Sequence, residues 1–340
     1  MAPEDVARVA KSGVSLRAEI ARLGLRYFVK KNSHHETIDQ ARAKFRSIEA
    51  LIPYPPQGTR TQRVDAYGAP ADLITTPASR QDRYVLYLHG GGYRIASPAT
   101  YRHFTWRIAT AACAHLFVLD YRLAPEHPFP AALDDAVSAY RWLLANGGQA
   151  KKLAVMGDSA GGGLALALLL KLRDGGMPLP AAAVALSPWT DLALTGRSLR
   201  LNADADPMLN ADDLPQFASE YFAGTDPKNP YVSPLYGDPA GLPPTLFHVG
   251  GDEILRDDAV RMAEKMIDAK CAVALEIWPR MPHVWHLLAP VIPEAMAAIR
   301  KIGAFIERAF MERPRIGRNG DKTTAPLRNP QTGTPDGQRR

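Results

Sequence analysis

The stretch that decides the fold is Leu153-Ala154-Val155-Met156-Gly157-Asp158-Ser159-Ala160-Gly161-Gly162. Its first half is apolar on both faces, as in a strand of a parallel sheet that helices cover on both sides. Its second half contains the pattern G-x-S-x-G and leads into a helical pattern. A sharp strand-to-helix turn projects the serine hydroxyl out of the sheet. We therefore predict that Ser159 is a nucleophile; the alternative is an N-capping serine in a glycine-rich helix start.

Strand-like and helical segments alternate around this stretch, which is typical of an α/β fold. Helical patterns fall near residues 100–113, 131–146, 160–173, 257–270 and 293–311. We predict a mostly parallel eight-stranded sheet with helices on both faces and a helical cap. Its expected strands span residues 62–65, 72–75, 84–88, 116–121, 153–157, 182–186, 245–250 and 273–278.

The remaining segments suggest the domain organisation. Residues 1–48 have helical periodicity and are expected to form an N-terminal cap segment. A catalytic domain is expected over residues 49–312, in which residues 187–244 are too long for a plain crossover and should contribute to the cap. Residues 313–340 are rich in Pro, Gly, Thr and Asn, so we predict a disordered basic tail.

Charge and composition exclude several classes of protein. The net charge is +6, but residues 313–340 contain seven basic and two acidic residues, so about +1 remains for the rest of the chain. This distribution argues against a nucleic-acid-binding protein. The apolar runs are far shorter than the ~20 residues of a membrane span, and we see no secretory signal. Cys113 and Cys271 form no metal or redox pattern, which favours free thiols in a cytoplasmic protein.

A second glycine-rich segment, His89-Gly90-Gly91-Gly92-Tyr93, follows the expected strand at residues 84–88. Glycines without side chains let backbone N–H groups turn toward a substrate oxyanion. The alternatives are a flexible turn or a phosphate-binding loop, but the spacing matches neither phosphate-binding motif. Its occurrence together with the serine motif favours an oxyanion hole.

A serine nucleophile needs a base that an acid orients, and in this type of fold the chain order is serine, acid, histidine. His283 lies just beyond the last expected strand and is the candidate base, while His286 is expected to be a packing residue. Asp257 should open a helix. Asp252 and Glu253 both follow the preceding strand, and their chemistry alone does not separate them.

These motifs resemble the bacterial hormone-sensitive-lipase-like family of α/β-hydrolases, also described as family IV or α/β-hydrolase fold-3 esterases. The resemblance covers roughly residues 50–310. Besides the two glycine-rich motifs, it includes Asp120-Tyr121-Arg122-Leu123-Ala124-Pro125-Glu126-His127-Pro128-Phe129-Pro130, Ser187-Pro188-Trp189-Thr190-Asp191 and Val232-Ser233-Pro234-Leu235.

The resemblance implies a serine carboxylesterase for short- to medium-chain acyl esters, with a mobile cap, no cofactor and no metal. It also implies that Gly91, Gly92 and Ala160 donate the oxyanion N–H groups. The family's acid motif is Asp-Pro-Leu-x-Asp, whereas this chain has Glu253-Ile254-Leu255-Arg256-Asp257 at the corresponding place. Aligned in this register, the acid position is Glu253 and not Asp252. Homodimerisation through the last strand is implied by the resemblance alone. Candidates for lining a substrate pocket, or equally for core packing, are Tyr93, Trp189, Met208, Leu209 and Trp285.

Two rival functions fit the same motifs. An acyltransferase or amidase would use the same three residues with another acceptor, and product analysis would distinguish it. A non-catalytic ligand receptor of the same fold, as in the plant gibberellin receptors, would lack the histidine, whereas His283 is present. In every case we expect a small-molecule partner, no nucleic acid and no membrane span.

Overall fold

The computed structural model describes residues 8–9, 13–32 and 37–311. The eight predicted strands and one further strand form a single sheet in the order β1-β9-β8-β7-β6-β4-β5-β3-β2. Strand β3 pairs antiparallel with β2 and β5, and the other neighbours pair in parallel. The strands are β1 (Arg8–Val9), β2 (Arg60–Ala66), β3 (Ala69–Thr75), β4 (Tyr84–Leu88), β5 (His115–Leu119), β6 (Leu153–Asp158), β7 (Ala182–Leu186), β8 (Thr245–Gly250) and β9 (Val273–Trp278).

The short strand β1 differs from the sequence prediction, because the helical pattern expected over residues 1–48 is wrong at Arg8–Val9. These two residues pair in parallel with Glu276 and Ile277 of β9. The edge of an open sheet presents unpaired N–H and C=O groups, and pairing with them outweighs a local helical pattern. A homodimer through β9 therefore has to use an edge that β1 occupies at these two positions.

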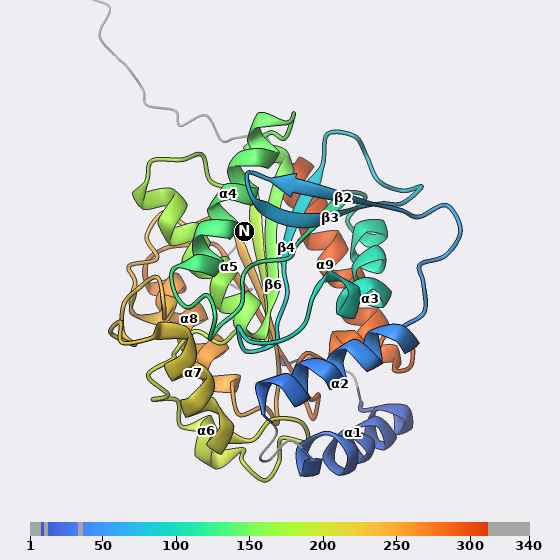
Figure 1. Ribbon diagram of the computed structural model, residues 1–340, viewed down its shortest axis with the longest axis vertical. Helices are drawn as coiled ribbons and strands as arrows, with labels where there is room; N and C mark the ends of the chain where they lie inside the picture. Colours follow the sequence, from blue (N-terminus) through green and yellow to red (C-terminus); the bar gives the residue numbers. More distant parts are fainter. Residues whose placement is uncertain (1–7, 10–12, 33–36, 312–340) are drawn as a thin grey trace, which may run out of the picture.

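Helices cover both faces of the sheet, as predicted (Figure 1). Helices α3 (Pro98–Ala111) and α9 (Pro293–Met311) share one buried cluster, and α4 (Ala131–Ala145), α5 (Ser159–Asp174) and α8 (Arg256–Asp268) share the other. Strand side chains alternate between the two clusters because successive residues point to opposite faces. Every residue of β6 is buried, which explains why its sequence is apolar throughout.

The N-terminal segment forms helices α1 (Leu16–Phe28) and α2 (Ile38–Leu51), begun by side-chain caps at Ser15 and Thr37. The insertion contains α6 (Ser198–Leu201) and α7 (Leu214–Phe222). Figure 1 shows α1, α2, α6 and α7 gathered at one end of the molecule, away from β2 and β3. Short 3-10 helices complete the chain: η2 (Lys30–Asn32), η3 (Ala150–Lys152), η4 (Ala211–Asp213), η5 (Pro234–Tyr236) and η6 (Trp285–Leu288).

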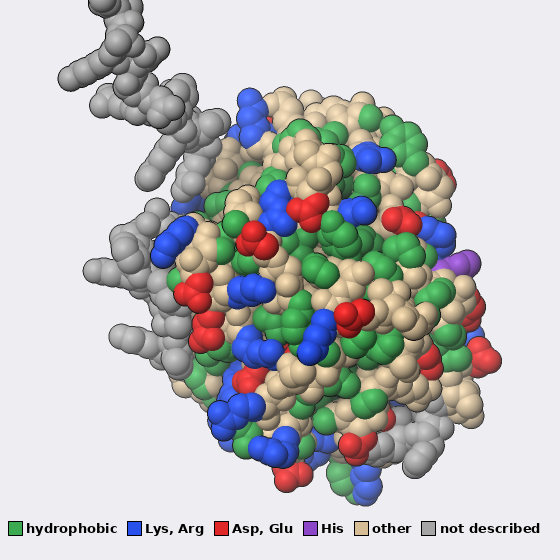
Figure 2. Space-filling view, turned by 90° about the vertical axis from the view of Figure 1, so that its left-hand side faces the viewer, with side chains coloured by type: hydrophobic (Ala, Val, Ile, Leu, Met, Phe, Trp, Pro, Cys, Tyr) green, Lys and Arg blue, Asp and Glu red, His purple; other side chains and the backbone are tan. Residues whose placement is uncertain are grey.

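Basic and acidic side chains are interspersed among apolar ones on the face shown in Figure 2. This mixture agrees with the small net charge that the sequence assigns to the chain before its tail. The tail predicted for residues 313–340 lies outside the described residues. No helix within the described ranges is long and apolar enough to cross a membrane.

Candidate active site

The turn between β6 and α5 holds Ser159 in a strained conformation. Its φ angle is 53°, in the left-handed region that side chains with a Cβ rarely adopt. The turn is tight because glycines surround it: a Cβ atom at Gly161 would collide with the main chain of Leu88 and His89, and one at Gly157 would collide with Gly161. These contacts explain why the motif needs glycine on both sides of the serine.

The glycine-rich loop after β4 lies against this turn. Gly91 and Gly92 have φ angles of 111° and 62°, and a Cβ atom on Gly91 would collide with the main chain of Ile95. Both glycines line the same pocket as Ser159. Ala160, the other residue expected to donate an oxyanion N–H group, is fully buried in the first turn of α5.

Asp158 connects the loop to the serine turn. Its buried carboxylate accepts hydrogen bonds from the Gly90 N–H at 2.9 Å and from the hydroxyls of Tyr87 and Tyr101 at 2.5 and 2.8 Å. Burial raises the pKa of Asp158 to about 6, and the two tyrosine hydrogen bonds oppose that rise. Asp158 therefore holds the glycine-rich loop against the turn that carries Ser159.

The structure brings His283 and Glu253 together. His283 Nδ1 lies 2.8 Å from Glu253 Oε2, while Oε1 accepts hydrogen bonds from the Ser187 hydroxyl and the Gly250 N–H, both at 2.6 Å. Glu253 is completely buried, and burial raises its pKa while the contacts with His283 and Ser187 lower it. Burial lowers the pKa of His283, but the hydrogen bond and charge of Glu253, with the charges of Asp206 and Asp158, raise it above its usual value.

Asp252, the alternative acid, points elsewhere. Its carboxylate pairs with Arg22 of α1 at 2.8 Å, and its side chain is 22% exposed. Asp257 lies in the first turn of α8, as expected, and accepts a hydrogen bond from the Ser198 N–H at 2.9 Å. Of the three carboxylates that the sequence offered as candidates, Asp252, Glu253 and Asp257, only Glu253 contacts His283.

Ser159 and His283 line one pocket of about 180 Å³. Among the bonds of the described residues none joins these two side chains, and catalytic hydrogen bonds often tighten only when substrate is bound. The rest of the lining is mainly apolar. It includes three of the five candidates from the sequence, Trp189, Met208 and Leu209.

The other two pocket candidates lie in the core instead. Tyr93 stacks on Tyr221 with ring centroids 3.6 Å apart, and Trp285 packs against His286 at 4.0 Å. His286 Nε2 contacts His248 Nδ1 at 3.1 Å, and burial lowers the pKa of both rings. The sequence placed Tyr93 and Trp285 near the site but did not show whether their rings point into the pocket or into the core. The rings point into the core because burial of a large ring is strongly favourable.

Asp206 is a positioning residue that the sequence analysis missed. It is fully buried, and its carboxylate accepts hydrogen bonds from the N–H groups of Ile254 at 2.9 Å, Met208 at 2.8 Å and Leu209 at 3.0 Å. One side chain therefore joins the residue after Glu253 to the wall of the pocket. In the sequence it occurs as Asp206-Pro207, which reads as an ordinary turn.

Phe45 of α2 and Phe217 of α7 were also missed, and both line the pocket. Phe217 lies next to Gly92, where a Cβ atom would approach its ring to 3.1 Å. Their helices are far from Ser159 in the sequence, so only the tertiary arrangement reveals these contacts.

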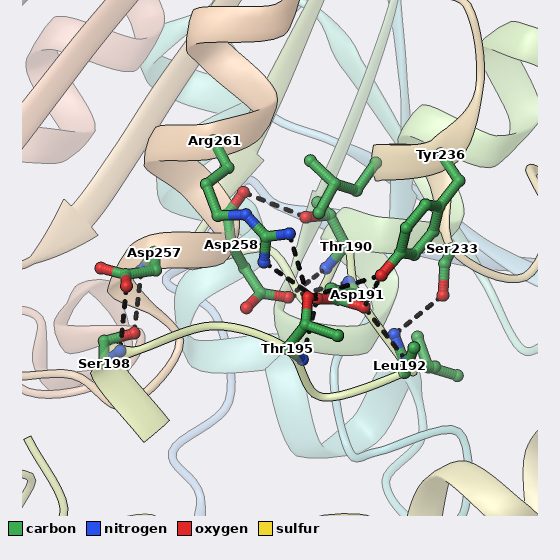
Figure 3. Close-up of polar contacts among 12 residues, drawn as sticks. Thr190, Asp191, Leu192, Thr195, Ser198, Ser233, Tyr236, Asp257, Asp258 and Arg261 are labelled. Carbon is green, nitrogen blue, oxygen red and sulfur yellow. Dashed lines mark hydrogen bonds and ion pairs between the residues drawn. The ribbon is translucent and has the colours of Figure 1, made fainter. Parts of the chain in front are cut away.

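A network of polar groups centred on the buried Asp191 and Asp258 joins the insertion to α8 (Figure 3). Asp258 Oδ2 accepts hydrogen bonds from the N–H groups of Thr190 and Asp191, both at 2.8 Å. Asp191 in turn pairs with Arg261 at 2.9 Å and accepts a hydrogen bond from the Tyr236 hydroxyl at 3.0 Å. Burial and the nearby charge of Asp191 raise the pKa of Asp258 to about 8. This network holds the residues after Trp189 beside the helix that follows Glu253.

Comparison with known proteins agrees with this architecture. A family model described as alpha/beta hydrolase fold matches residues 85–287. An acetyl-hydrolase of Streptomyces hygroscopicus is 46% identical over 252 residues, which cover 72% of this chain and 84% of that protein. The carboxylesterase/phospholipase LipF of Mycobacterium tuberculosis is 36% identical over 266 residues, covering 75% and 71%.

Solved structures show the same relationship. An esterase from the bacterial hormone-sensitive lipase family superposes with a TM-score of 0.83 at 42% identity, covering 88% of this chain and all of that chain (100%). An esterase/lipase from an uncultured bacterium gives a TM-score of 0.83 at 39% identity, covering 87% and 99%. The chain belongs to the α/β-hydrolase fold family. Within it, the chain is a member of the hormone-sensitive-lipase-like, family IV branch.

Proposed function

We propose that this protein is a serine carboxylesterase that hydrolyses short-chain acyl esters through an acyl-enzyme intermediate. The observation that carries the proposal is one pocket lined by both Ser159 and His283, with His283 hydrogen-bonded to the buried Glu253. The relatives named acetyl-hydrolase and carboxylesterase support the same reaction class.

In the first half-reaction, Ser159 Oγ attacks the ester carbonyl while His283 Nε2 accepts the hydroxyl proton. Glu253 holds the imidazole through Nδ1 and stabilises its positive charge. The tetrahedral intermediate collapses when the C–O bond to the alcohol breaks, and His283 returns the proton to the leaving oxygen. Water then attacks the acyl-enzyme with His283 again as base, releasing the acid and restoring the serine.

The developing oxyanion is assigned to the N–H groups of Gly91, Gly92 and Ala160. The positive φ angles of both glycines and the position of Ala160 directly after Ser159 support this assignment. The N-terminus of α5 adds a favourable dipole at the same point. These groups are fixed before substrate binds, so they stabilise the transition state without reorganisation.

The volume of the pocket limits the length of the acyl chain that it can hold. A cavity of 180 Å³ is close to the roughly 150 Å³ that accommodates a benzene molecule in an engineered protein core. Acyl groups of a few carbons fit this space, whereas longer chains require Phe45 or Phe217 to move. We therefore propose that α1, α2 and the insertion form a cap, and that its position sets the upper limit of chain length.

The test uses p-nitrophenyl esters from acetate to laurate with the wild type, Ser159→Ala and the control Ser219→Ala, which changes an exposed serine of α7. We expect Ser159→Ala to lose activity by several orders of magnitude, Ser219→Ala to keep it, and the rate to fall with chain length. Equal activity of Ser159→Ala and wild type contradicts the proposal. Ester products that predominate over hydrolysis in the presence of added alcohols would identify an acyltransferase instead.

A further inference from the structure

Helix α1 turns its apolar side away from the protein. Leu16, Ile20, Leu23 and Tyr27 follow the spacing of one helical face, and their exposed fractions are 76%, 61%, 67% and 64%. A surface helix normally packs such a stripe against the core. In α1 only Ala18 is buried, so the usual orientation is reversed.

The charged side of α1 makes the contacts with the body. Arg280 donates two hydrogen bonds to Glu19, at 2.7 and 2.8 Å, and Arg22 pairs with Asp252 at 2.8 Å. Arg26 donates a hydrogen bond to a main-chain carbonyl of the insertion. The helix is therefore held mainly by its polar face and Ala18, and Leu16, Ile20, Leu23 and Tyr27 remain exposed.

Helix α2 shares this orientation in part, although its Phe45 faces the pocket. Arg42 and Glu49 bond inward, to Glu126 and to the hydroxyls of Ser97 and Thr100, while Leu51 is 83% exposed. Twelve large apolar side chains are exposed among the described residues, and eight of them fall between residues 16 and 54. A concentration of this kind marks an interaction surface rather than chance exposure.

The charge of this segment indicates what it binds. Within the described ranges, residues 13–32 and 37–54 contain eight basic and three acidic residues. Two of those acids, Glu19 and Glu49, are engaged in inward contacts. So are four of the basic residues, namely Arg22, Arg26, Lys30 and Arg42. Four basic residues and one acidic residue remain outside these contacts. The outward surface therefore combines apolar side chains with exposed cations such as Arg17 and Lys31, a combination typical of helices that lie in a membrane interface.

We propose that the outward face of α1 and α2, which we call the cap surface, docks on an anionic lipid surface. A second copy of the chain is disfavoured as the occupant, because a two-fold contact would bring two basic surfaces together. The tail at residues 313–340 is disfavoured for the same reason, since it has seven basic and two acidic residues.

Docking in this orientation would bring the pocket close to esters in the lipid. This role of docking rests on the proposed esterase function. Phe45 lines the catalytic pocket from α2, and Ile48 and Leu51 of the same helix are exposed. The exposed side chains of α2 therefore lie within two helical turns of a residue that lines the pocket. An ester dispersed in the lipid would reach Ser159 by a short path beside α2.

The experiment measures co-sedimentation of the full chain with vesicles of phosphatidylcholine alone or mixed with phosphatidylglycerol. We expect binding to the mixed vesicles that is about tenfold or more above phosphatidylcholine and weakens with salt. The variants Ile20→Ser/Leu23→Ser and Arg17→Glu/Lys31→Glu should lose that binding. The matched controls Tyr67→Ser, on the β2–β3 turn, and Arg80→Glu/Lys151→Glu change exposed residues elsewhere and should keep it.

Hydrolysis of p-nitrophenyl acetate in solution separates this proposal from the proposed function, because all these variants should retain it. Absence of vesicle binding, equal binding to both vesicle types, or binding that survives Ile20→Ser/Leu23→Ser overturns the proposal. So does a dimer in sedimentation velocity that Ile20→Ser/Leu23→Ser abolishes, since a second copy would then cover the surface.

Discussion

The sheet with its site loops and the N-terminal helices are held in place by different forces. Every residue of β4 after Tyr84 and all of β6 are buried, as are Glu253 and His283 beside them. Helix α2 has no buried residue and is attached through Arg42 and Glu49. Burial fixes the site residues, whereas hydrogen bonds and ion pairs make most of the contacts that attach α1 and α2. Screening by salt should therefore loosen the cap and leave the site intact.

The largest effect is expected at the acid. Glu253→Gln should lower kcat by roughly 10²–10⁴-fold, because the amide can no longer stabilise a protonated His283. Asp252→Asn is the matched control, since its partner is Arg22 and not His283. Steady-state kinetics on a p-nitrophenyl ester measure both. Loss of activity in Asp252→Asn with retention in Glu253→Gln would reverse our assignment.

The contrast in burial predicts a second large difference, in stability. Phe104 of α3 is completely buried, and Phe104→Ala should cost about 3–5 kcal/mol of unfolding free energy. Leu23 of α1 is 67% exposed, and Leu23→Ala should change it by less than about 0.5 kcal/mol. Chemical denaturation measures both values. Equal losses would mean that α1 packs on the body through its apolar face.

Asp206 joins the acid loop to the part of the insertion that lines the pocket. Asp206→Asn should lower kcat/KM by about tenfold, because the new amide N–H would face the Ile254 N–H. In the proposed mechanism His283 must be neutral to act as the base, so kcat/KM should rise as pH passes the pKa of this residue. Glu253, Asp206 and Asp158 all raise that pKa, and His286 faces the same ring.

Removal of one of these charges should move the acidic limb of the pH profile to lower pH. The control is Asp204→Asn, which changes an exposed carboxylate two residues away. An unchanged pH profile in Asp206→Asn, with reduced activity, would assign Asp206 a purely structural role.

The smallest effect is expected at the contacts of the cap. Arg42→Ala removes the ion pair with Glu126, whose pKa the hydrogen bond from Arg42 lowers to about 2. The pair is half exposed on the Glu126 side, so its loss should cost at most about 1 kcal/mol. KM for the ester should rise at low salt, while kcat stays near the wild-type value. A collapse of kcat would show that α2 takes part in the chemistry.

Much of this arrangement could be predicted from local sequence. The apolar run of residues 153–156 predicted a buried strand, and the small residues around Ser159 predicted a tight turn. Both predictions were possible because these features depend on residues that are neighbours in the chain. The register of Glu253 relative to the family motif led to the carboxylate that contacts His283. The direction in which side chains and helices point could not be predicted from local sequence. Tyr93 and Trp285 turn into the core, and the apolar side of α1 faces outward, because packing between distant segments decides both.

The serine mechanism has one most direct test. The full chain is incubated with a fluorophosphonate, and the modified peptide is located by mass spectrometry. We expect a single adduct on Ser159 that is absent from Ser159→Ala and forms at least about a hundredfold more slowly in His283→Ala, because the nucleophile then lacks its base. An adduct on another residue, or undiminished labelling of His283→Ala, would contradict the account.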